Sequence, residues 1–186
     1  MADKKNCQEL LLCSINDFYQ KNLKFKNTFK DIISGDHKLS LRLIDWLVTH
    51  YSRNNYIFYW FNTSFDDIYY NLPDNINNNN ISYKKINLYH DYRAQLKSFS
   101  KLNFDTFRRH QRITFCIDDK NSIETTVGQL NFFRWIFNNK IISYALENYD
   151  IIYNDMISNN NYNKKIIKKN NNFQEIIKTN SILRFD

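Results

Sequence analysis

Only two glycines and one proline interrupt the 186 residues of this chain, and their scarcity limits the folds and sites that it can form. Gly35 and Gly128 are isolated, so neither lies in a glycine-rich loop of the kind that binds the phosphates of dinucleotides or nucleoside triphosphates. No internal repeat has the length typical of solenoid proteins. The sequence therefore excludes phosphate-loop motifs and repeat architectures.

The composition supports one compact domain. Aromatic residues make up 17% of the chain and apolar residues 42%, and aromatic side chains supply large buried areas. The mean hydropathy of -0.63 is polar mainly because asparagine and lysine are abundant. Such a bias toward Asn, Lys, Ile, Tyr and Phe is typical of an AT-rich genome, so individual asparagines need no functional explanation. The length suits one domain with a small lobe or tails.

The spacing of apolar residues predicts an α+β fold, in which three or four helices pack with a short antiparallel hairpin or sheet. The expected elements are a weakly specified short helix over Leu10–Tyr19, a helix from a cap at Asp36 or Ser40 to Tyr51, a strand over Tyr56–Phe61, a helix over Asn87–Ser100, a strand over Arg112–Asp118 that pairs with Ser122–Thr125, an apolar helix after Thr126, and a helix over Ile141–Met156. Thr126 and Gln129 have the spacing of a capping box.

Low-complexity stretches suggest the domain boundaries. We expect a weakly specified N-terminal segment over residues 1–36. A single α+β domain then covers 37–157, with a loop insert at 62–82 that contains Pro73 and an asparagine tract. A basic low-complexity tail follows at 158–186.

The histidines and cysteines form no recognisable catalytic or metal-binding pattern. No pair has the Cys-x-x-Cys spacing, and the four histidines are scattered along the chain. We expect Cys116, which lies in an apolar strand, to be a buried small hydrophobic residue. The sequence thus predicts a protein without a metal or cofactor that is not an enzyme. It also predicts neither a signal peptide nor a membrane span, and the three sparse cysteines favour a reducing compartment.

Positive charge is concentrated between Lys84 and Arg112. This segment has eight cationic and two acidic side chains, so it carries +6 of the formal net charge of +7. Three of the cations lie four residues apart and would form one stripe on the expected helix. Guanidinium groups bind phosphate well, and neighbouring aromatic rings can stack on bases. The candidate nucleic-acid-binding residues are Arg93, Lys97, Lys101, Arg108, Arg109, Arg112 and Arg134.

Two alternatives remain open for these cations. They can form a solvated face whose arginines cap carbonyl groups or pair with Asp91 and Asp105, and Arg134 can either join the cluster or pair with an acid such as Glu147. The protein would then be a structural or protein–protein interaction component that docks through the aromatic run Tyr56–Phe61. A divergent enzyme without a recognisable motif is a third class.

Three stretches of the sequence are similar to one protein family. They are SLRLIDWLVTHYSRNN at Ser40–Asn55, YRAQLKSFSKLNFDTFRRHQRITF beginning at Tyr92, and ETTVGQLNFFRWIFNN, which ends at Asn139. The chain resembles a functionally uncharacterised family of nucleocytoplasmic large DNA viruses, in particular the mimivirus-like group. Members of that family tend to have proline where this chain has Thr106. They commonly have an asparagine-glycine pair at the end of a helix, where this chain has Asn138-Asn139.

The resemblance implies a viral source, a location in the viral factory of the host cytoplasm or in the virion, and no known catalytic residues. Within GQLNFFRW we expect Leu130, Phe133 and Phe137 in the core, and Gly128 to allow a close approach of another backbone segment. The leading hypothesis is a non-enzymatic viral protein that binds DNA, RNA or another polyanion. Other virion proteins are the alternative partners.

Overall fold

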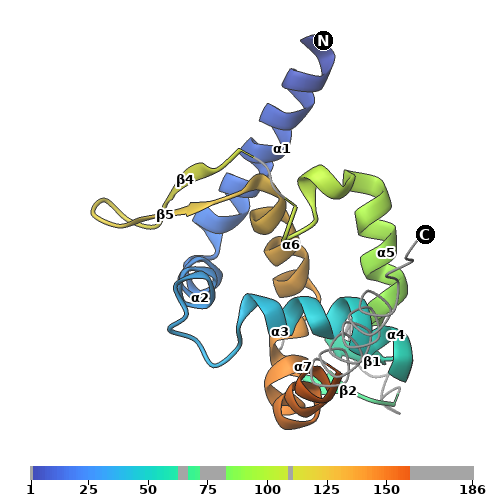
Figure 1. The fold of residues 1–186 in the computed structure, drawn as a ribbon. Helices are drawn as coiled ribbons and strands as arrows, with labels where there is room; N and C mark the ends of the chain where they lie inside the picture. The colour runs from blue at the N-terminus through green and yellow to red at the C-terminus, as the bar shows by residue number, and fades with distance from the viewer. Residues whose placement is uncertain (1, 63–66, 72–82, 109–110, 160–186) are drawn as a thin grey trace, which may run out of the picture.

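The structure is a computed structural model that describes residues 2–62, 67–71, 83–108 and 111–159 (Figure 1). The α-helices are α1 (Ala2–Lys21), α2 (Leu23–Ser34), α3 (Leu41–Trp46), α4 (Ser52–Asn55), α5 (Leu88–Phe99), α6 (Val127–Asn138) and α7 (Ile141–Glu147). The strands are β1 (Phe58–Asn62), β2 (Ile68–Tyr69), β3 (Tyr83–Asn87), β4 (Ile113–Cys116) and β5 (Ser122–Thr125). A π-helical turn η1 (Leu47–Tyr51) and a 3-10 turn η2 (Lys101–Asn103) complete the elements.

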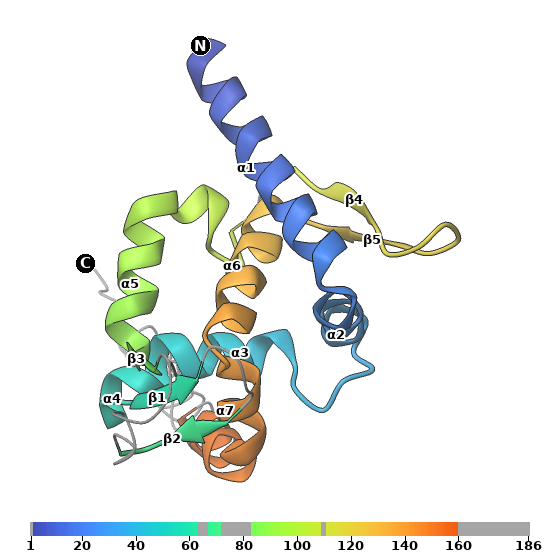
Figure 2. The same cartoon turned by 180° about the vertical axis from the view of Figure 1, so that it is seen from behind.

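Helix α6 forms the centre of the molecule. It passes between α5 on one side and α1, α2 and the β4–β5 hairpin on the other (Figures 1 and 2). Nine of its twelve residues are buried, because apolar side chains occupy almost every face. Two buried tyrosines bind it at both ends, since Tyr19 donates to the carbonyl of Leu130 at 3.0 Å and Tyr59 donates to the carbonyl of Asn139 at 2.8 Å.

The N-terminal residues form two helices rather than one short helix. The rings of Tyr19 on α1 and Phe29 on α2 lie 5.8 Å apart, and Phe29 contacts Phe133 of α6 at 5.0 Å. Gly35 ends α2 in the left-handed conformation with φ 87°, which glycine adopts without strain. The described part of the segment that we expected to be weakly specified therefore contributes directly to the core.

The helix expected up to Tyr51 is present but longer. The Ser40 hydroxyl accepts a hydrogen bond from the Leu43 amide at 3.2 Å and caps α3. The chain then continues through η1 and α4, and it leaves the helix at Tyr56 in the left-handed region with φ 50°. Ser40 is thus the cap, and the strand begins two residues after Tyr56, at Phe58.

The strands form two antiparallel sheets. One has the order β2-β1-β3, with Trp60 of β1 opposite Tyr69 of β2 and Lys85 of β3. Strand β2 lies inside the segment expected to be a loop, and no strand was predicted at β3. Two residues are too few to give β2 a detectable alternation, and β3 is rich in lysine and asparagine, so neither had a strand-like pattern.

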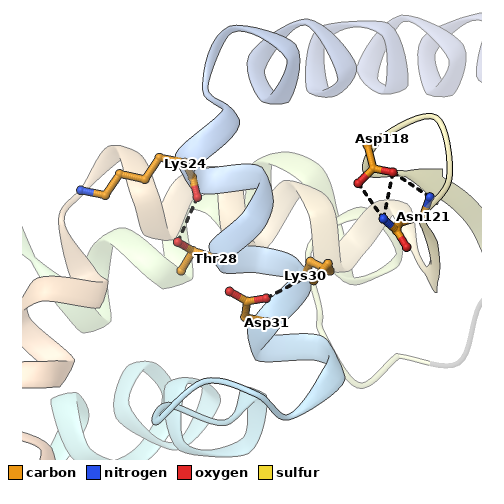
Figure 3. A network of polar contacts seen from close by, with 6 residues as sticks. All are labelled: Lys24, Thr28, Lys30, Asp31, Asp118 and Asn121. Atoms are coloured by element: carbon orange, nitrogen blue, oxygen red, sulfur yellow. Dashed lines mark hydrogen bonds and ion pairs between the residues drawn. The ribbon is translucent and has the colours of Figure 1, made fainter.

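The other sheet is the predicted hairpin β4–β5. Its turn is closed by Asp118, whose carboxylate accepts hydrogen bonds from the amides of Lys120 and Asn121 at 2.9 and 2.8 Å. Hydrogen bonds from the Asn121 side chain and these amides lower the pKa of Asp118. Figure 3 shows this turn beside α2, where Lys30 and Asp31 form an ion pair at 3.5 Å.

The expectation that Cys116 is buried is wrong. Phe115 packs against Tyr19 and Phe29, and it is therefore the residue of β4 that faces the core. Because successive side chains of a strand point to opposite faces, Cys116 is exposed.

The α+β class is confirmed, but three or four helices is too few. The predicted break at Asn138-Asn139 is present, because α6 ends there and Lys140 adopts φ 56° before α7 begins. The helix expected over Ile141–Met156 is interrupted at Asn148, and residues 149–159 are helical. The tail was expected at residues 158–186. Its first two residues belong to this helix and the others lie outside the described residues, so the domain boundaries stay a prediction.

Candidate functional site

Helix α5 presents Arg93 and Lys97 to solvent, but the predicted third member of the stripe, Lys101, lies beyond the end of the helix. Leu88 and Tyr92 are buried on its inner side, whereas Arg93 and Lys97 are exposed on the outer side. The helix begins at Asn87, whose side chain accepts a hydrogen bond from the His90 amide at 3.2 Å. The local periodicity therefore positions these two cations as predicted.

The chain leaves α5 through Ser100, which has φ 65°, and Lys101 is exposed in η2. Phe104 then enters the core, with its ring 5.6 Å from that of Phe132. This buried ring holds the segment that continues to the exposed Arg108. Arg109 lies outside the described residues.

The acids near these cations are bound to backbone amides. The Asp91 carboxylate accepts a hydrogen bond from the Asn87 amide at 2.8 Å, and that of Asp105 accepts one from the Phe107 amide at 3.0 Å. Within the part of the chain that the structure describes, no carboxylate lies within 4.0 Å of a cationic nitrogen of Arg93, Lys97, Lys101 or Arg108. Arg93 and Arg108 therefore do not pair with Asp91 or Asp105.

Arg112 differs from the other cations, because it forms an ion pair with Glu124 at 3.4 Å. Both side chains are about 71% exposed, and ion pairs of this kind contribute little to stability, about 0–1 kcal/mol. Glu124 partly neutralises Arg112, so Arg112 contributes less to the positive surface than Arg108 does.

Arg108 and Arg112 line a hollow of about 460 Å³ at the N-terminus of α6. The Thr126 hydroxyl caps this helix by accepting the Gln129 amide at 3.1 Å. The Gln129 side chain does not complete the capping box, because it accepts from Thr125 at 2.8 Å and donates to the carbonyl of Thr106 at 3.2 Å. It thereby connects α6 to the segment that carries Arg108.

Arg134 is not part of the same hollow. Its guanidinium donates to Asn131 at 2.7 Å and to Ser14 at 3.0 Å, and lies 5.9 Å from the centre of the Phe99 ring. Burial lowers the pKa of this half-buried guanidinium, and the nearby Tyr19 hydroxyl opposes this shift. It lines a separate hollow of about 290 Å³ together with Lys84. Arg134 connects α6 to α1, and Glu147 instead accepts from Tyr70 at 3.0 Å.

The expected aromatic docking run is only half exposed. Tyr59 and Phe61 are buried, whereas Tyr56 is 80% exposed and Phe58 49% exposed. The ammonium of Lys85 lies 5.0 Å from the centre of the Phe58 ring, a contact that the sequence did not reveal. The alternation within FYWF was the available signal, but its use required knowing that Lys85 lies on the neighbouring strand.

Asp45 connects α3 to the segment before Arg108. Its carboxylate accepts a hydrogen bond from the Thr106 hydroxyl at 3.3 Å. Burial raises the pKa of Asp45 to about 6, the negative charge of Asp105 adds to this effect, and the Thr106 hydrogen bond and Arg42 oppose it. The buried Asp45 carboxyl, whose ionisation costs free energy, thus contacts the segment that leads to Arg108.

We expect Asp45→Asn to stabilise the protein at about pH 7.5, by roughly 1–3 kcal/mol, and to have little effect near pH 4. The folded protein keeps the Asp45 proton up to about pH 6, whereas the unfolded chain loses it near the ordinary value of 3.8. The free energy of unfolding therefore falls as the pH rises through this window, and the substitution removes that loss. Urea unfolding at both pH values measures the effect. The exposed Asp150→Asn is the control, and equal shifts in both variants would contradict the prediction.

No group of three or more His, Cys, Asp or Glu side chains that could hold a metal ion occurs in the described residues. In the same residues, no helix has the length and apolar character needed to cross a bilayer.

Comparison with known proteins identifies relatives but no activity. A model of a protein family described as "Family of unknown function (DUF7197)" matches residues 3–184. An uncharacterized protein of Acanthamoeba polyphaga mimivirus is 35% identical over 170 residues, which make up 89% of this chain and 58% of that protein. The chain thus spans little more than half the length of this relative. No solved structure matches it. The resemblance to an uncharacterised mimivirus-like family is confirmed.

Proposed function

We propose that this chain, which belongs to the DUF7197 family of unknown function, binds nucleic acid or another polyanion without catalysing a reaction. The surface that we assign consists of Arg93, Lys97, Lys101 and Arg108, and we call it the basic face. The observation that carries the proposal is that all four side chains are exposed while the adjacent Asp91 and Asp105 carboxylates bind backbone amides.

The charge state of the basic face favours a phosphate backbone as its ligand. Cations that lack an acidic partner attract mobile counterions, and a polyanion gains affinity by releasing them. Arg108 adds a planar guanidinium that can contact two phosphate oxygens at once. Phe107 beside it is 57% exposed and offers a ring to a base. The mimivirus relative is the basis for proposing that this binding takes place in the viral factory of the host cytoplasm or in the virion.

We expect Arg93→Gln/Lys97→Gln and Lys101→Gln/Arg108→Gln each to weaken binding to a DNA duplex and to reduce its salt dependence. Each lost phosphate contact lowers the slope of log K against log salt by about 0.9, so each pair lowers it by up to about 1.8. Fluorescence polarisation with a labelled duplex over a series of salt concentrations measures this slope.

The control for this experiment is Lys21→Gln/Lys120→Gln. It removes the same formal charge from exposed lysines at the end of α1 and in the hairpin turn. An equal loss of slope in the control and in the basic-face variants would mean that only net charge matters, and the assigned face would be wrong. No binding at low salt by the unchanged protein, either to the duplex or to one of its single strands, would refute the function itself.

The exposed Tyr56 and Phe58 favour one alternative, a structural or protein–protein interaction component of the virus particle. Light scattering distinguishes the two functions. Self-association that is insensitive to salt, without retention on DNA, would favour the structural role.

A further inference from the structure

The outer face of the three-stranded sheet is a second surface with a distinct chemistry. Along β1 the side chains alternate, so that Tyr59 and Phe61 are buried against the core and Phe58 and Trp60 lie on the opposite face. Tyr59 stacks on Tyr144 of α7 at 5.1 Å, which fixes the inner side. The outer side therefore presents aromatic rings on a strand that the core holds in place.

The register of the sheet adds further rings from both neighbouring strands. Tyr69 of β2 lies opposite Trp60, and Tyr83 of β3 lies opposite Asn62. The two tyrosine rings meet edge to face with their centres 5.6 Å apart, and Asn62 is only 4% exposed. Four rings from three strands thus share one face of the sheet: Phe58, Trp60, Tyr69 and Tyr83.

A cation lies directly on this aromatic surface. The ammonium of Lys85, opposite Trp60, lies 5.0 Å from the centre of the Phe58 ring and 5.4 Å from that of Trp60. In the described residues no carboxylate lies within 4.0 Å of it, so the rings are its neighbours rather than an acid. An ammonium beside the exposed Phe58 ring and the partly exposed Trp60 ring matches a ligand in which flat groups are linked by negative charges.

The strand that carries Lys85 leads directly into the helix that carries two residues of the basic face. Strand β3, which carries Lys85, passes directly into α5, which carries Arg93 and Lys97. Figure 2 shows the sheet at the base of α5. With a rise of about 1.5 Å per residue, Arg93 follows within about two helical turns of Asn87. A flexible strand that lies on the sheet and continues along α5 would reach Arg93 next.

From this arrangement we propose that the outer face of the sheet binds single-stranded nucleic acid, with unpaired bases stacked on Phe58 and Trp60 and a phosphate bound by Lys85. This inference rests on the proposed function and specifies its ligand. A duplex hides the faces of its bases, so it cannot use these rings, whereas every unpaired base offers a face to stack. The protein should therefore prefer single strands over duplexes of equal charge.

The test compares three labelled ligands of about 15 nucleotides by fluorescence polarisation: oligothymidine, an abasic backbone with the same number of phosphates, and a duplex. Phe58→Ala should weaken the binding of oligothymidine by about fivefold or more and leave that of the abasic backbone unchanged. Lys85→Gln should weaken both single strands, because it removes a phosphate contact. The control Tyr153→Ala removes an exposed ring from the helical residues 149–159 and should change neither.

A second measurement remains informative if Phe58→Ala is poorly folded. Stacking of a base on Trp60 should quench tryptophan emission when oligothymidine is added. Trp60→Phe should abolish most of this quenching and still bind, because phenylalanine keeps a ring for stacking. Trp46, which donates to Asp155 at 2.8 Å, and the buried Trp135 remain in this variant as internal references.

The outcomes separate this inference from the proposed function. Equal affinity for oligothymidine and the abasic backbone, with no effect of Phe58→Ala, would overturn the stacking site while binding by the basic face stands. Loss of binding on Phe58→Ala without any effect of the basic-face variants would refute the basic face and keep the sheet. Self-association that Phe58→Ala abolishes, with no nucleic-acid binding, would overturn both in favour of a protein partner.

Discussion

Replacing Phe104 by alanine is expected to lower the free energy of unfolding by about 3–5 kcal/mol, which corresponds to a fall in Tm of roughly 6–20 °C. The Phe104 ring is fully buried, and its centre lies within about 6 Å of the ring centres of Tyr92, Phe99, Phe132 and Trp135. Alanine would leave a cavity where α5 and α6 meet, and rigid neighbours fill such a cavity poorly. Urea unfolding measures the loss.

Phe107→Ala is the matched control for this substitution. Phe107 lies three residues further along the same segment and is 57% exposed, so its loss should change stability by no more than about 0.5 kcal/mol. A loss below about 1 kcal/mol for Phe104→Ala would show that the segment bearing Lys101 and Arg108 is not anchored by this ring.

The second large effect is expected for Gly128→Leu, with a loss of stability of about 3 kcal/mol. A Cβ atom at Gly128 would lie 3.1 Å from the carbonyl oxygen of Asp105 and 3.2 Å from that of Leu102. A larger side chain must push this backbone away from α6. The hydrogen bond from Asn131 to the Asn103 carbonyl, at 3.0 Å, would then break. Thermal unfolding measures the stability.

Two further glycine substitutions show whether space or conformation is responsible. Gly128→Ala should gain about 1 kcal/mol of stability from the higher helix propensity of alanine. The new methyl group requires the backbone near Asp105 to shift by a few tenths of an ångström, so the net change in stability should be within about 1 kcal/mol. Gly35→Asn should also be tolerated, because nothing lies within 4 Å of its Cβ position and asparagine tolerates positive φ. Equal losses for Gly128→Leu and Gly128→Ala would contradict a steric cause.

Elements with strong local signals were predictable from the sequence. Asn87 and Thr126 cap α5 and α6 where the periodicity of apolar residues begins, and Asp118 closes the hairpin turn. The close approach at Gly128 was also expected and is confirmed. In each case, side chains within a few residues of one another satisfy the backbone hydrogen bonds, so the information is local.

Elements whose stability comes from distant contacts were not predictable in the same way. Helix α2 depends on Phe29 reaching Phe115 and Phe133, about a hundred residues away in the chain. Strand β3 has only one buried residue, Ile86, and it exists because β1 pairs with it along its full length. Strand β3 has no regular pattern of its own. Helix α2 has one, because Phe25, Phe29, Ile32 and Ile33 recur at helical spacing, but no helix was predicted there.

The same distinction between local signals and distant contacts applies to the candidate site. The stripe of Arg93 and Lys97 follows from helical spacing, which the sequence contains. The contacts of Arg134 with Ser14 and Asn131 do not follow from the sequence, because the contact with Ser14 depends on α1 lying beside α6. The position of Lys85 over Phe58 likewise depends on the register between two strands.

The sequence alone determined the class of the fold, the cap of its central helix α6 and the segment in which positive charge accumulates, because spacing and turn chemistry act over a few residues. Only the tertiary structure decided which of the described cations face solvent, which one connects two helices, and which aromatic rings share a sheet face with a lysine. These properties depend on which distant segments come together, and the free energy that brings them together is the burial of rings around α6.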